Sequence, residues 1–231
     1  MPGSVSAPDE DFKAFAYGQF ARIGKALSSP ARLVLLNVLV QGPHTVEEAA
    51  RESGTSVANA SHHLQILKAS GLVEGRRQGQ SVVYSVAGEE VQSFFHAMKG
   101  LAVERLTDLQ QALQDIADSP TRAQAVGREE LLEMARNGDA VVIDVRPESE
   151  FRTAHLPGAV SVPLADLERH LDALPRDREV VAYCRGRYCL LADKAVEKLR
   201  AAGFRARRSD VDIVGWRQAN QPLEGVSARA R

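Results

Sequence analysis

Residues 45–86 carry helix start and stop signals in a fixed order, and this stretch limits the possible fold more than any other part of the chain. Thr45 is a good N-cap, and Glu48 three residues later completes a capping box. We therefore expect a short helix over 46–53. It should end at Gly54, because glycine accepts the left-handed backbone of a helix C-cap.

A second helix and a hairpin follow directly. Ser56 can cap a helix that stops at Gly71. Residues 72–77 and 81–86 flank a turn at Gly79, which predicts a β-hairpin. Short helix, turn, second helix and hairpin, in this order, predict a mainly helical winged helix-turn-helix domain that binds DNA.

The second helix has an apolar face and a polar face. We expect the apolar face to be buried, with Val57, Ala60, Leu64 and Leu67. Side chains of the polar face and of the hairpin tip suit base edges and phosphates. The predicted DNA-contacting residues are Ser56, Asn59, Ser61, His62, Gln65, Lys68, Arg76, Arg77 and Gln80. The alternative is a solvated polar helix face beside a structural hairpin.

This region resembles the ArsR-type family of bacterial dimeric winged-helix repressors over roughly residues 20–115. The resemblance rests on SPARLVLLNVL, on the Ser61-x-His63-Leu64 stretch and on the run GLVEGRRQGQSVVY. It implies a homodimer that binds a palindromic operator in double-stranded DNA and is released by an inducer. It also implies a packed, structural role for His63.

One long amphipathic helix is expected from Glu89 to Asp118. Its apolar side chains recur every three or four residues, as Phe95, Met98, Ala102, Leu106, Leu109, Leu113 and Ile116. A helix of this length cannot bury such a seam alone, so we interpret the stripe as a dimer surface. Packing within the domain is the alternative.

A metal site is not expected in the first half of the chain. Residues 46–51 contain no cysteine, although metal-sensing members of the family often carry a cysteine pair there, and His96 is the one obvious ligand on the long helix. His62 and His63 are neighbours on a helix and point about 100° apart, so a shared metal is not expected. Sensing is therefore expected in the second half.

The second half alternates strands and helices. We assign a linker to 119–126, around Pro120, between a first domain over 1–118 and a second over 127–231. Strands are predicted over 140–145, 160–162, 179–183 and 204–208, and helices over 128–136, 164–173 and 190–202. This alternation predicts an α/β domain with a parallel sheet, whose ligand site lies at the carboxyl ends of the strands.

Cys184 lies at such a strand end, directly before a helix. Loop amides, the helix dipole, Arg185 and Arg187 would all favour an anion there. We therefore expect a thiolate with a lowered pKa at Cys184, and hence a nucleophile. A buried structural cysteine is the alternative.

Residues 125–225 resemble the rhodanese family. The resemblance rests on VVIDVRPESEFRTAHLPGAVSVPL and on AYCRGRYCLLADKAVEKLRAAGF. It implies sulfur transfer, in which Cys184 takes a sulfane sulfur from thiosulfate or a persulfide and passes it on. The implied catalytic and donor-loop residues are Cys184, Arg185, Gly186, Arg187, Tyr188 and Cys189, and the implied framework residues are Asp144, Arg146, His155 and Trp216.

Three positions refine this chemistry. Leu190 stands where a protein tyrosine phosphatase loop needs arginine, so sulfur fits better than phosphate. Asp212 stands where the family usually has a Gly-Gly turn, and a left-handed residue there would be strained and turnover slow. Cys189 either resolves a Cys184 persulfide or sulfenate as a disulfide, or is a small apolar residue at the helix start.

Composition indicates the compartment. Two cysteines in 231 residues indicate a reducing environment. No apolar run is long enough to span a membrane and no signal peptide is visible, so we expect a cytoplasmic protein without membrane contacts. We expect no cofactor.

The leading hypothesis is a dimeric repressor whose second domain senses or transfers sulfane sulfur through a persulfide on Cys184. Two alternatives stay open. One is a sulfurtransferase enzyme tethered to DNA, and the other is a non-catalytic rhodanese fold used for interaction.

Overall fold

The computed structural model describes residues 8–119, 122 and 124–225. The chain divides into two compact units, Met1–Ser93 and Phe94–Arg231. Of the predicted linker over 119–126, residues 120, 121 and 123 lie outside the described part. The predicted fold class is confirmed: a winged helix-turn-helix unit is followed by an α/β unit with a parallel sheet.

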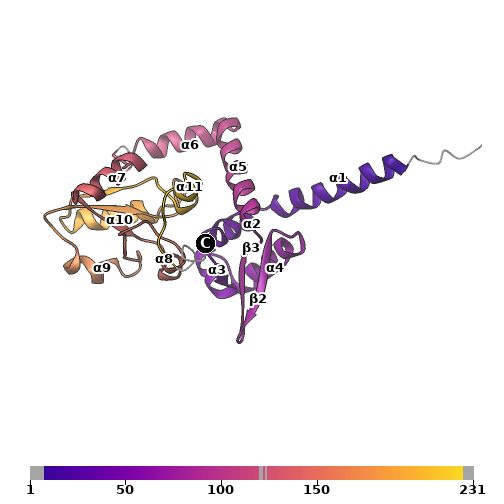
Figure 1. Cartoon of the computed structure of the whole chain (residues 1–231), viewed down its shortest axis with the longest axis horizontal. Coiled ribbons are helices and arrows are strands. Elements are labelled where there is room, and N and C mark those ends of the chain that lie inside the picture. The colour runs from indigo at the N-terminus through magenta and orange to yellow at the C-terminus, as the bar shows by residue number, and fades with distance from the viewer. Residues whose placement is uncertain (1–7, 120–121, 123, 226–231) are drawn as a thin grey trace, which may run out of the picture. The chain divides into compact units, whose positions relative to one another are not determined.

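The first unit combines helices with a small antiparallel sheet (Figure 1). Its elements are α1 (Pro8–Leu27), α2 (Pro30–Leu39), β1 (His44–Thr45), α3 (Val46–Ser53), α4 (Val57–Ala69), β2 (Val73–Gln78) and β3 (Ser81–Val86), followed by the start of α5 (Glu89–Arg105). The strand order is β1-β3-β2.

The predicted caps form as expected. The backbone N–H of Glu48 donates to Thr45 Oγ1 at 3.2 Å, and the backbone N–H of Thr45 donates to Glu48 Oε2 at 2.8 Å. Gly54 has φ +67°, which glycine adopts without strain. Ser56 Oγ accepts from the backbone N–H of Asn59 at 3.3 Å. The bonds set where α3 and α4 begin, and the left-handed Gly54 sets where α3 ends.

Two predictions for this region were wrong. Val57 is 48% exposed, because it is the first residue of α4 and lies before the part of the helix that packs on the core. Ala60, Leu64 and Leu67 are buried as predicted. The expected single helix over 89–118 is two helices, α5 and α6 (Thr107–Ala117), because Leu106 is extended with φ −103° and ψ 102°. No glycine or proline signals this break.

The second unit contains a parallel sheet with helices on both faces. After α6 come α7 (Arg128–Asn137), β4 (Ala140–Asp144), α8 (Glu148–Thr153), β5 (Val160–Ser161), α9 (Leu167–His170), the 3₁₀ helix η1 (Leu171–Ala173), β6 (Glu179–Tyr183), α10 (Leu191–Ala201), β7 (Ala206–Arg208) and α11 (Ile213–Gln218). The strand order is β5-β4-β6-β7. Helices α8 and α11 were not predicted, and the helix expected over 164–173 is the shorter pair α9 and η1.

Side chains alternate across this sheet and fill two cores. One core joins alternate strand residues, among them Ala182, Cys184 and Ala206, to α9 and α10. The other joins Val181 and Tyr183 to α7 and α11. Because β5 and β6 flank β4 on opposite sides, the chain changes direction here, and in such sheets the site lies at the carboxyl ends of the strands.

Candidate nucleic-acid interface and sulfur site

Helix α4 presents a polar face beside the hairpin. Asn59, His62, Gln65 and Lys68 are exposed, and Ser61 is half-buried. His62 and Gln65 lie opposite the buried Ala60, Leu64 and Leu67, and Asn59 and Lys68 flank them on the two sides of the helix. Amide, imidazole and ammonium groups in this arrangement can reach base edges and phosphates.

The hairpin adds two arginines to this surface. Arg76, Arg77 and Gln80 are exposed, and Arg76 and Arg77 pair across the hairpin with Val83 and Val82. Arg76 Nη2 lies 3.5 Å from a carboxylate oxygen of Glu74, an exposed pair that costs little to open.

His63 differs from its neighbour His62. Burial lowers the pKa of His63, and the nearby His62 and Arg32 lower it further, which favours the neutral ring. This environment fits the predicted structural role. Within the described ranges, no three His, Cys, Asp or Glu side chains gather as a metal-binding group.

Cys184 sits directly after β6, with its side chain fully buried under α10. Its Sγ lies 3.7 Å from the carbonyl oxygen of Cys189 and 4.0 Å from that of Gly186. Gly186 turns the loop with φ +88°. The backbone N–H of Ala192, in the first turn of α10, also points to the Cys184 sulfur.

The two cysteines form a hydrogen-bonded pair. Donating to Cys189, together with burial, raises the pKa of Cys184 well above its ordinary value. Accepting that bond lowers the pKa of Cys189 to about 6, although burial opposes the shift. These directions favour a proton on Cys184 and a negative charge on Cys189, in contrast to the predicted thiolate at Cys184.

The loop arginines do not surround Cys184 with positive charge as predicted. Arg185 Nε lies 3.1 and 3.2 Å from the two carboxylate oxygens of Glu150, so its charge is balanced by a buried carboxylate. Arg187 and Tyr188 are exposed. No local sequence pattern predicts the Glu150 contact, since it joins residues 35 positions apart.

A buried arginine lies at the end of β7, and it was not among the predicted site residues. Arg208 is 0% exposed, and its Nη1 lies 3.1 and 3.0 Å from the carboxylate oxygens of Asp193 on α10. Its positive charge acts to lower the pKa of Cys184, against the larger effects of the Cys189 bond and burial. One signal was available, because strand side chains alternate and one of the consecutive Arg207 and Arg208 had to face inward.

Arg122 binds the same carboxylate from the segment before α7. Its Nε and Nη2 lie 2.9 and 2.7 Å from Asp193, and its Nη1 donates to the carbonyl oxygen of Arg187 at 2.8 Å. A residue of the predicted linker therefore holds the loop that follows Cys184.

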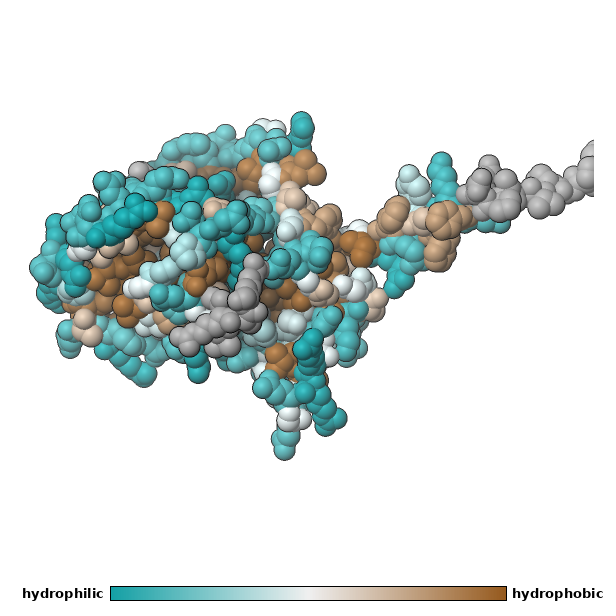
Figure 2. All heavy atoms as spheres, viewed as in Figure 1, coloured by the Kyte–Doolittle hydropathy of each residue, from teal (hydrophilic) through white to brown (hydrophobic). Residues whose placement is uncertain are grey.

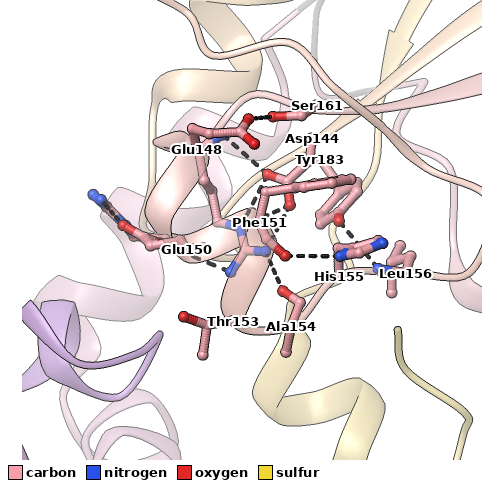
Figure 3. A network of polar contacts seen from close by, with 12 residues as sticks. Asp144, Glu148, Glu150, Phe151, Thr153, Ala154, His155, Leu156, Ser161 and Tyr183 are labelled. Carbon is pink, nitrogen blue, oxygen red and sulfur yellow. Dashed lines mark hydrogen bonds and ion pairs between the residues drawn. The ribbon is translucent and has the colours of Figure 1, made fainter. Parts of the chain in front are cut away.

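Asp144 lies in a network of polar contacts that also includes Glu150, His155 and Tyr183 (Figure 3). Arg146 Nη2 lies 2.6 Å from Asp144 Oδ2, and Nε donates to the same carboxylate. Burial alone would lower the pKa of Arg146, but the adjacent Asp144 raises it. His155 stacks on Phe151 with ring centroids 3.7 Å apart, which fits a structural role.

Asp212 is not strained, contrary to the prediction. It has φ −129° and ψ 159°, and its Oδ1 accepts from the backbone N–H of Gly215 at 2.7 Å, so it caps α11. A short N-capped helix replaces the expected glycine turn. The Asp212 carboxylate also lies against Gly186, where an added Cβ would be 2.7 Å from Oδ2.

Two family patterns match the chain. A helix-turn-helix domain pattern matches residues 27–76, and a rhodanese-like domain pattern matches residues 127–219. No helix among the described residues has the length and apolarity needed to cross a membrane.

Known proteins match one or both halves. The HTH-type transcriptional regulator Rv0324 of Mycobacterium tuberculosis is 41% identical over 218 residues, which cover 94% of this chain and 96% of that protein. The tRNA sulfurtransferase of Desulfurococcus amylolyticus is 32% identical over 54% of this chain and 24% of its own length. The solved homodimeric winged helix-turn-helix domain of Mb0332 from Mycobacterium bovis is 40% identical, with a TM-score of 0.40, and covers 47% of this chain and 95% of that one. The chain therefore belongs to the ArsR-type winged helix-turn-helix transcriptional regulators that carry a C-terminal rhodanese-like domain.

Proposed function

We propose that this regulator senses sulfane sulfur, which it takes up as a persulfide on Cys184 and reports as a change in operator affinity. The observation that carries the proposal is the position of Cys184, which is buried at the carboxyl end of β6 with its Sγ 3.7 Å from the Cys189 carbonyl oxygen, in a chain whose other unit is a winged helix-turn-helix fold.

The pair supports a balanced transfer. The Cys189 thiolate accepts the proton of Cys184, and the Cys184 thiolate attacks the outer sulfur of a donor persulfide R–S–SH. The S–S bond of the donor breaks, RS⁻ leaves, and Cys184 becomes Cys–S–SH. The total charge is conserved, and no outside oxidant is needed.

Arg122, from the segment before α7, is hydrogen-bonded to the loop of the sulfur site. Its hydrogen bond to the Arg187 carbonyl oxygen ends on the loop between Cys184 and Cys189. If the loop changes shape around an added sulfur atom, this bond can break. We therefore propose that Arg122 responds to the addition of sulfur to Cys184.

A second copy of the chain is the proposed partner in DNA binding. Four aromatic side chains on α1 are 62–70% exposed, Phe12, Phe15, Tyr17 and Phe20, and Phe94 and Leu101 on α5 are also exposed. Figure 2 shows apolar residues at the surface of α1. Apolar surface of this kind favours association, and the family resemblance implies a homodimer. In the predicted stripe on α5, Phe95 is core rather than interface, because it is buried.

The test is an operator-binding titration. Reduced protein selects its preferred duplex from a random library, and affinity for that duplex is measured before and after treatment with glutathione persulfide. Cys184→Ser should abolish the change in affinity, and intact mass should show one added sulfur atom on the wild-type protein. Sulfur on Cys184 with unchanged DNA affinity would instead favour a sulfurtransferase tethered to DNA, and absence of added sulfur would favour an interaction module.

A further inference from the structure

Arg208 and Cys184 lie at the same end of one sheet face. Strands β6 and β7 are adjacent and parallel, with Ala182 opposite Arg208. Ala182, Cys184 and Ala206 all face α10. Because side chains alternate along a strand, Arg208 faces the same way as Ala206 and lies one strand away from Cys184 under the first turn of α10.

The charges around Arg208 do not cancel. The single carboxylate of Asp193 binds both Arg208 and Arg122, so these three buried groups carry a net positive charge. The other carboxylate, Asp210, lies 2.8 Å from Arg208 Nη2 but is 53% exposed, where water screens it. A buried cation without full compensation is costly and favours a nearby anion.

Arg208 also carries a hydrogen-bond donor that is not satisfied. Its Nε is buried and has no hydrogen-bond partner among the residues that the structure describes. Buried donors are nearly always satisfied, and those that are not often belong to functional sites. A negative charge on the neighbouring sulfur would complete the surroundings of this guanidinium.

We propose that Arg208 is the positioning residue of the sulfur site, and that its buried guanidinium, in place of the loop arginines, supplies the positive charge that holds an ionised sulfur atom on Cys184. The groups that act on Cys184 are Cys189 from the loop, the Ala192 amide from α10 and Arg208 from β7. This inference rests on the proposed function for the nature of the anion, a persulfide, but its test does not require one.

The experiment measures ionisation of Cys184 in the full chain. Cys189→Ser leaves Cys184 as the one thiol, so the pH profile of its alkylation by iodoacetamide, followed by intact mass, reports its titration. Adding Arg208→Gln should raise the midpoint and lower the thiolate fraction at pH 7 about tenfold or more, because a neighbouring opposite charge shifts a pKa by roughly 1–3 units. Arg208→Lys should restore most of the loss.

Arg207→Gln is the matched control. It removes the neighbouring guanidinium of β7, which faces the other side of the sheet and pairs with Glu130 and Glu179, and it should leave the Cys184 midpoint close to its original value. Equal shifts in Arg208→Gln and Arg207→Gln, or no shift in Arg208→Gln, would overturn the inference. If Arg208→Gln does not fold, Asp193→Asn removes the buried counter-charge of Arg208 instead and should lower the midpoint; an unchanged midpoint would overturn the inference equally.

Treatment with a persulfide distinguishes a failure of this inference from a failure of the proposed function. Wild-type and Arg208→Gln proteins are treated with glutathione persulfide, and intact mass follows the added sulfur. If the midpoint shifts as expected but no sulfur is added to the wild type, the proposed function fails and the role of Arg208 stands. If sulfur is added to both proteins at the same rate and the midpoint is unchanged, the role of Arg208 fails alone.

Discussion

Replacing Asp144 with asparagine tests whether the buried network holds the rhodanese-like unit together. Asp144 and Arg146 are both fully buried, and the carboxylate accepts from the backbone N–H, Nε and Nη2 of Arg146 at 2.6–3.1 Å. Removing one charge of such a pair leaves the other buried and uncompensated, which costs about 3–5 kcal/mol. Glu150, 3.7 Å from Arg146 Nη1, retains part of the compensation, so we expect the lower end, about 3 kcal/mol.

Tryptophan fluorescence makes this measurement specific to one unit. Trp216 is the single tryptophan of the chain, and it is 3% exposed in the core of the rhodanese-like unit. With a urea slope of about 1–3 kcal/mol/M, a loss of about 3 kcal/mol lowers the unfolding midpoint by roughly 1–3 M. Urea titration followed by Trp216 emission therefore reads the effect directly.

Glu148→Gln is the control for the same network. Glu148 accepts a hydrogen bond from Ser161 but its side chain is half exposed, so its loss should cost about 1 kcal/mol or less. A midpoint for Asp144→Asn as high as that of Glu148→Gln would refute the reasoning, since it would mean that the buried carboxylate carries no net charge or that water reaches Arg146.

Other predictions concern the cysteines, the loop and the DNA surface. Cys184→Ala removes the donor and should raise the pKa of Cys189 from about 6 towards its ordinary value, because the Cys184 bond is the largest cause of the lowering; a pH profile of Cys189 alkylation that still has its midpoint near 6 would contradict this. Gly186→Ala should slow sulfur loading in mass spectrometry, because φ +88° costs alanine about 1–2 kcal/mol and the new Cβ meets Asp212; loading at the wild-type rate would count against the loop geometry. Arg76→Ala should weaken DNA binding and reduce its salt slope by about 1, whereas Gln65→Ala should cost about 1–3 kcal/mol at selected base pairs only, and equal loss on every sequence would exclude direct reading by Gln65.

Local signals predicted the elements well where they act through local bonds. The capping box of Thr45 and Glu48, the glycine at 54 and the N-cap at Ser56 each use hydrogen bonds or backbone angles within a few residues, so the sequence predicts them directly. The break at Leu106 has no such signal. It is accompanied by a hydrogen bond from the Gln110 side chain to the Glu104 carbonyl, which replaces a helical bond without leaving a recognisable pattern.

The charged neighbours of Cys184 could not be predicted from the sequence. Arg185 and Arg187 stand next to Cys184 in the chain, so proximity in sequence predicts that they stabilise its anion. In the fold, Arg185 instead meets Glu150, and the buried cation near Cys184 is Arg208, 24 residues further along the chain. Electrostatic effects depend on distance and burial in space, and neither can be read from the order of the residues.

The coupling proposed through Arg122 requires little energy. A tenfold change in operator affinity corresponds to about 1.4 kcal/mol. A hydrogen bond from a charged group, such as that from Arg122 to the Arg187 carbonyl oxygen, contributes roughly 1.5–3 kcal/mol, so making or breaking this one bond is sufficient. Arg122→Gln should therefore still bind the selected duplex and still take up sulfur on Cys184, but its affinity for the duplex should no longer change when sulfur is added. A full response in this variant would show that the signal leaves the sulfur loop by another route.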